Sequence, residues 1–157
     1  MPKVKLEVDI QVQHAAWRKA WPRASSDIKV LIDVASNAVK FPSRLKAAEV
    51  SVVLASDSRL RSLNSQFRGR DKPTNVLSFP DEAVPLGGLA LAFQTVQREA
   101  KIQQKLFVNH SKHMILHGFL HLLGHDHIRP RDARLMEQLE IAILSELGIS
   151  NPYEFED

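Results

Sequence analysis

The chain of 157 residues contains no cysteine. This absence excludes a disulfide framework and a zinc site built on thiolates, so any zinc ion must be bound by histidine, aspartate or glutamate. The sequence also has no apolar run close to the ~20 residues of a membrane span, and its first stretch, MPKVKLEVDI, lacks the apolar centre of a signal peptide. We therefore expect a cytoplasmic protein that does not contact a membrane.

Aromatic residues are also scarce, at 6% of the chain, so stacking platforms for nucleic-acid bases are few. Hydrophobic residues make up 44% and charged residues 25%, which is ordinary for a globular domain. No repeat, low-complexity tract or linker interrupts the sequence. We expect residues 1–157 to form a single domain with one hydrophobic core.

The apolar pattern predicts strands and helices in mixed order. Apolar and charged residues alternate over 4–10, which indicates a half-buried strand, and the apolar run 49–56 indicates a buried one. The other predicted elements are a connector at 17–23, a strand at 76–79, a loop at 81–88, an edge strand at 89–92, and helices from the capping residues 25–27 to 41, and at 57–67, 94–103, 109–123 and 131–147. This order predicts an α+β fold in which one small mixed sheet is packed by several helices.

Three histidines stand at relative positions 0, 4 and 10: His117, His121 and His127, with Gly124 at position 7. Two histidines four residues apart lie on one helix face, and both can reach one ion at about 2.0–2.1 Å. Gly124 can take the left-handed conformation that ends a helix, so that the chain returns with His127. Three nitrogen ligands and an open fourth position predict a catalytic zinc site. Since 109–123 is apolar almost all round, this site is expected on a buried core helix.

The same spacing occurs in the metzincin proteases, in which a glutamate beside the first histidine is the general base. Here that position is Gly118. A metallopeptidase would keep its metal geometry in this chain but lack its base, and it remains an alternative.

Other residues near the motif have open roles. His113 lies one turn before His117; it either lines the groove beside the metal and contacts substrate, or is an ordinary, partly buried histidine. Asp126 is either a hydrogen-bond acceptor for a ligand ring or a plain turn residue. His125 would become a ligand only if the helix continued through Gly124, and we expect that it does not. Two more histidines have no partner pattern and are interpreted as ordinary: His14 and His110.

Charge is unevenly distributed in this chain of net charge +3. Residues 59–72 hold five basic residues and one acid, whereas 131–157 hold two arginines and seven acids. A basic stretch suits a polyanion, which releases counterions on binding, although a solvated helix face is the plainer explanation.

Within this stretch, Arg68 has a planar fork suited to a phosphate. The turn-forming residues after it are expected to present Lys72, Thr74 and Asn75 toward the site.

Two motifs in order, RGRDKPTNVLSFP at 68–80 and HGFLHLLGHDH at 117–127, resemble the YbeY family of bacterial single-strand-specific endoribonucleases. The resemblance runs from about Asn64 to Pro152 and includes the ending Asn151-Pro152-Tyr153. Two departures stand out: family members often have tyrosine at the position of His125, and Gly-Asp where this chain has Gly87-Gly88. Any role of that acid is absent here or filled elsewhere.

The resemblance implies a zinc-dependent hydrolase that cleaves RNA in ribosomal RNA maturation and ribosome quality control. It also implies that His117, His121 and His127 bind the metal and that Arg68 is functional. The attacking group would be either a water or an RNA 2′-hydroxyl, and Arg68 would stabilise charge on the phosphoryl oxygens.

The implied partners are single-stranded ribosomal RNA and the ribosome, with no role for DNA. A non-catalytic RNA-binding or ribosome-binding protein with a structural metal is a further alternative. The sequence does not distinguish zinc from nickel as the native metal.

Overall fold

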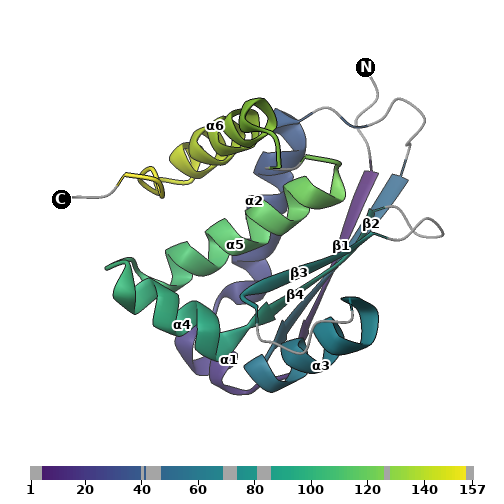
Figure 1. Ribbon diagram of the computed structural model, residues 1–157, viewed down its shortest axis with the longest axis vertical. Coiled ribbons are helices and arrows are strands. Elements are labelled where there is room, and N and C mark those ends of the chain that lie inside the picture. The colour runs from purple at the N-terminus through teal and green to yellow at the C-terminus, as the bar shows by residue number, and fades with distance from the viewer. Residues whose placement is uncertain are drawn as a thin grey trace.

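The computed structural model describes residues 5–39, 41, 47–68, 74–80, 86–125 and 128–154. Within them, four strands form one mixed sheet with six helices around it, which confirms the predicted α+β class (Figure 1). In chain order, the elements are β1 (Lys5–Val12), α1 (Ala16–Ala20), α2 (Ala24–Ala38), β2 (Ala47–Ala55), α3 (Asp57–Arg68), β3 (Val76–Pro80), β4 (Leu86–Ala92), α4 (Phe93–Ile102), α5 (Phe107–Leu122) and α6 (Pro130–Glu146).

The strand order in the sheet is β1-β2-β4-β3. Strands β1, β2 and β4 are parallel, and β3 is antiparallel to β4. The prediction of an edge strand at 89–92 was therefore wrong, because β4 pairs on both sides and is longer than expected. Side chains on both of its faces are buried, so the alternation that would reveal its position is missing. Strands β1 and β3 form the two edges of the sheet. Pro80, at the end of β3, has no N–H to donate, which an edge strand tolerates.

Helices cover both faces of the sheet (Figure 1). Helix α5 packs on β3 and β4, and α2 packs beside it toward β1, while α6 lies over α2 and α5. Helix α3 covers part of the opposite face, where it forms a smaller apolar cluster with Leu60, Leu77 and Ala90. The main core lies between the sheet and the α2–α5 layer.

The segment before α2, predicted to be a connector at 17–23, is partly helical. It contains the short helix α1, whose Trp17 is completely buried and donates from Nε1 to the Ala55 carbonyl at 2.8 Å. The expected cap at 25–27 was also wrong. Helix α2 begins at Ala24, and the Asp27 carboxylate instead accepts from the indole Nε1 of Trp21 at 2.8 Å.

Helix α5 is the core helix that the sequence predicted. Ile115, Leu116, Phe119 and Leu120 are all fully buried. The helix lies so close to the sheet that a Cβ added at Gly118 would be 2.8 Å from Leu89 Cδ2. No helix in the described parts of the chain is both long and apolar enough to cross a membrane.

The end of α5 has the predicted left-handed glycine. Gly124 has φ +96°, its N–H donates to the His121 carbonyl at 3.0 Å, and the N–H of His125 donates to the Leu120 carbonyl at 3.0 Å. These two bonds form the Schellman motif that ends a helix. The chain therefore leaves the helical path before His125.

We expect Gly118→Ala to lower the free energy of unfolding. The added methyl would lie within 3.3 Å of Ser78 Oγ and Val76 Cγ2, as well as closer to Leu89. Overpacking of this kind costs about 1–3 kcal/mol, and the better helix propensity of alanine returns at most about 1 kcal/mol. Chemical denaturation measures the difference. Lys112→Ala, at a half-exposed position of the same helix, is the control; equal stability of both variants would contradict the close packing.

Candidate metal centre

Four histidines form a row along α5: His110, His113, His117 and His121. Successive members are one helical turn apart, and their ring centroids are separated by 6.4, 6.4 and 4.6 Å. The row runs from a buried end at His110 to a half-exposed end at His121.

At the half-exposed end, His117 and His121 direct ring nitrogens at each other. The two Nε2 atoms are 3.1 Å apart. Two nitrogens that each lie 2.0–2.1 Å from one tetrahedral ion are about 3.3 Å apart. The helix therefore brings the predicted pair to a separation that fits a shared ion.

A carboxylate from α6 contacts the other side of His117. Glu140 is completely buried, and its Oε1 lies 3.1 Å from His117 Nδ1. Since an ionised carboxylate only accepts, the proton of His117 lies on Nδ1, and the lone pair lies on Nε2, the atom that faces His121 Nε2. Asp126, the acceptor candidate in the sequence, lies outside the described residues.

Two further donors meet the second oxygen of Glu140. The Tyr153 hydroxyl donates to Oε2 at 2.8 Å, and His113 Nε2 contacts the same atom. The Tyr153 ring also stands edge-on to the His113 ring, with centroids 5.5 Å apart. A buried carboxylate requires such partners, because an unpaired buried charge is strongly destabilising.

The hydrogen bonds decide the ionisation of this cluster. Burial raises the pKa of the Glu140 carboxyl, but the bonds from His113 and His117 outweigh it and lower the pKa to about 2. Burial lowers the pKa of His113, so its neutral ring donates the Nε2 proton to Glu140. Burial and the adjacent Glu140 charge raise the pKa of Tyr153, which therefore keeps its hydroxyl proton.

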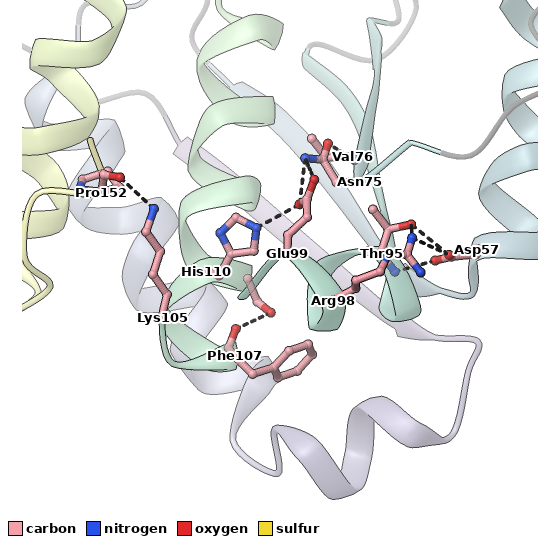
Figure 2. Close-up of polar contacts among 11 residues, drawn as sticks. Asp57, Asn75, Val76, Thr95, Arg98, Glu99, Lys105, Phe107, His110 and Pro152 are labelled. Atoms are coloured by element: carbon pink, nitrogen blue, oxygen red, sulfur yellow. Dashed lines mark hydrogen bonds and ion pairs between the residues drawn. The ribbon is translucent and has the colours of Figure 1, made fainter. Parts of the chain in front are cut away.

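At the buried end of the row, His110 is part of a second polar group, shown in Figure 2. His110 Nε2 lies 2.9 Å from Glu99 Oε1 on α4, and the Glu99 carboxylate accepts from Asn75 Nδ2 at 3.1 and 3.2 Å. The Asn75 side-chain oxygen accepts from the Val76 N–H at 2.7 Å. The segment that enters β3 is thus bound to α4 directly and to α5 through Glu99, and the Asn75 amide has partners within the protein.

The remaining predicted site residues lie at the margin of the described chain. His127 and Lys72 are outside the described residues. Arg68 is the last residue of α3, and its side chain is also outside the described parts; Thr74 is half-buried just before Asn75. Among the residues that the structure describes, no three His, Cys, Asp or Glu side chains group to hold an ion. The roles of His127, Arg68, Lys72 and Thr74 stay predictions.

Sequence reasoning missed Glu140, Tyr153 and the Glu99–His110 pair. One signal was available for Glu140, which lies between the buried Met136 and Ile143 on α6, since an acid on an apolar helix face needs a partner. Tyr153 offered no such signal, because it meets His113 across 40 residues of sequence.

The donor set fits zinc. The two nitrogens converge, the Nδ1 of His117 is held by Glu140, and the side chain of His117 is 24% exposed, so the site is open to a further ligand. Imidazole nitrogens suit zinc, and they suit nickel and copper as well.

Comparisons with known proteins agree along most of the chain. A family model described as Endoribonuclease YbeY matches residues 10–148. The Endoribonuclease YbeY of Paramagnetospirillum magneticum is 40% identical over 161 residues, covering 96% of this chain and 97% of that protein. The Endoribonuclease YbeY of Chelativorans sp. is 43% identical over 152 residues, covering 90% of this chain and 92% of that protein.

A solved structure shows the same fold. The solution structure of TM1509 from Thermotoga maritima matches with a TM-score of 0.59 at 22% identity, covering 94% of this chain and 99% of the other. Because the family model spans most of the sequence and relatives about 40% identical match it almost end to end, this chain belongs to the YbeY family.

Proposed function

We propose that this protein is a zinc-dependent, single-strand-specific endoribonuclease that acts in ribosomal RNA maturation and ribosome quality control. The observation that carries the proposal is the 3.1 Å approach of the Nε2 atoms of His117 and His121 in a chain of the YbeY family. The relatives bear the name endoribonuclease, which supports RNA as the substrate.

His117, His121 and His127 would hold the ion. A zinc ion bound there would supply a Lewis acid and an activated nucleophile at neutral pH. Glu140 keeps the proton of His117 on Nδ1, so Nε2 is the atom of His117 that would bind the ion. Arg68 binds the scissile phosphate and stabilises the negative charge that develops on its oxygens.

The segment between α3 and β3 binds the RNA strand in this proposal. Lys72 and Thr74 precede β3 in the sequence. The Ser78 hydroxyl of that strand donates to the carbonyl of Gly118, the neighbour of His117 on α5, at 3.1 Å. Asn75 and His113 are also predicted to contact substrate, and this stays a prediction. Both have partners within the protein, so we propose that they also hold this segment and Glu140 in place.

A metallopeptidase is the competing function, and the packing of α5 opposes it. A helix base would have to stand at position 118, where an added Cβ meets Leu89 and the sheet rather than open space. This chain therefore lacks the peptidase general base, and the packing against Leu89 leaves no space for its side chain at position 118. A non-catalytic RNA-binding protein is the other alternative, and an activity assay decides that point.

The proposed substrate also implies partners and location. Ribosomal RNA would be met on the ribosome or its precursors, so we propose ribosome association and a cytoplasmic location. Neither DNA nor a membrane is a proposed partner.

The function is tested by elemental analysis of the purified protein, together with cleavage of labelled single-stranded RNA, the same RNA in a duplex, and casein. We expect bound zinc, cleavage of the single strand alone, loss of cleavage with a chelator and its recovery with zinc. Cleavage of casein but not RNA would favour the peptidase. RNA binding with no cleavage would favour the non-catalytic alternative.

Alanine in place of His117, His121 or His127 is expected to remove the bound metal, because two remaining nitrogens bind an ion too weakly to retain it. Elemental analysis after gel filtration measures the loss, and circular dichroism checks the fold. His125→Tyr is the matched control and should keep metal and most activity, since α5 ends before this residue. Full occupancy in any alanine variant would remove that histidine from the ligand set.

Arg68→Ala is expected to keep fold and metal but to lower kcat/KM on single-stranded RNA by about 10²–10³, as loss of one oriented charge contact does. Arg131→Ala on α6 is the control for the loss of an arginine elsewhere. Wild-type cleavage by the Arg68 variant would show that this side chain is only part of the surface.

RNA binding is expected to weaken steeply with salt, partly through the exposed Arg59 and Arg61 on α3. This helix lies on the sheet face opposite α5, so RNA reaching both must pass around the β3 edge. Each contact removed by glutamine should flatten the slope of log K against log salt by about 0.7. Arg131→Gln and Arg134→Gln on α6 are the controls. Equal slopes in all four variants would mean that Arg59 and Arg61 belong to a solvated helix face that does not contact RNA.

A further inference from the structure

The C-terminal residues Asn151-Pro152-Tyr153 take no part in the proposed chemistry, yet Tyr153 contacts Glu140, the carboxylate that contacts His117. Asn151 Oδ1 accepts from the Tyr153 N–H at 2.9 Å, which closes a tight turn. The carbonyl of the buried Pro152 accepts from Lys105 Nζ at 2.7 Å, between α4 and α5 (Figure 2). One bond therefore closes this turn after α6, and the other holds it against the segment that leads into the histidine helix.

The fixed turn aims the Tyr153 hydroxyl at the buried carboxylate of Glu140. The hydroxyl and His113 Nε2 both contact Oε2, whereas Oε1 is left to His117 Nδ1 at 3.1 Å. The carboxylate cannot rotate Oε1 away from His117 without breaking its contacts at Oε2. Its orientation is therefore set from two elements, α5 and the C-terminal turn.

The position of the His117 proton decides whether this ring can bind a metal. A neutral imidazole has two tautomers, and a proton on Nε2 would occupy the atom that faces His121. A carboxylate at Nδ1 selects the other tautomer. Without an ion, His121 Nε2 can then donate to His117 Nε2. To bind an ion with Nε2, His121 would have to carry its proton on Nδ1 instead.

We propose that Glu140, with Tyr153 and His113, forms a positioning cluster that keeps the proton of His117 on Nδ1 and thereby presents its Nε2 to the metal. The expected effect on metal affinity rests on the proposed zinc site. The expected effect on the His117 tautomer concerns the metal-free protein and does not depend on that site. A purely structural role for the cluster would change stability alone, whereas a positioning role changes the tautomer and the affinity of a folded protein.

Glu140→Gln tests the centre of the cluster, because it keeps the shape of the side chain but leaves it one acceptor oxygen. Long-range ¹H–¹⁵N NMR on the metal-free protein should show His117 protonated on Nδ1 in the wild type and a tautomer mixture in the variant. Zinc affinity, measured by competition with a chromophoric chelator, should fall by about 10–100-fold. Glu146→Gln, an exposed position on the same helix, should change neither quantity.

Tyr153→Phe is the milder second variant and decides the question if Glu140→Gln does not fold. It removes the hydroxyl but leaves the ring against His113, so we expect a smaller shift of both readouts in the same direction. An unchanged His117 tautomer and unchanged zinc affinity in the folded variants would overturn the proposal. If the wild type binds no zinc, the proposed function fails, and the NMR spectra of the metal-free proteins still decide whether the cluster positions His117.

Discussion

The close approach of α5 to the sheet at Gly118 sets which side of that helix meets the strands. With no side chain at 118, the helix backbone lies against Leu89 and Ser78. Neighbouring positions on a helix are rotated by about 100°, so His117 is turned from the strands toward Glu140 on α6, and His121 lies one turn further along the face of His117. Gly118 stands where a metzincin protease has its glutamate base. Its lack of a side chain also allows the packing that leaves His117 and His121 on a face where they could bind an ion.

A second constraint follows from placing an ionised carboxylate among apolar helices. Glu140 is fully buried, and such a charge is tolerated only when its oxygens are occupied by donors. Those donors are His113, His117 and Tyr153, which come from α5 and the C-terminal turn. The requirement of one buried charge therefore couples the end of the chain to the candidate metal pair, and it couples α6 to α5 by more than apolar packing.

Local sequence patterns predicted the local features well. The four-residue spacing placed His117 and His121 on one face, and Gly124 ended α5 before His125, because both depend only on helix geometry and backbone freedom. The position of β4 was mispredicted, since an edge strand and an interior strand of the same composition differ only in their neighbours. The cap at 25–27 failed for a similar reason: Asp27 is bound by Trp21 rather than by its own helix.

The sequence by itself determined the class of fold, the helical histidine pair and the exclusion of thiolate ligands, since these follow from periodicity, spacing and composition. Only the tertiary structure decided which acceptor holds His117, because Glu140 is 23 residues distant in sequence and belongs to another helix. It also decided that the Tyr153 turn supports that acceptor and that position 118 must lack a side chain. Such contacts join segments whose separation carries no periodic signal, and they exist only once the helices have packed on the sheet.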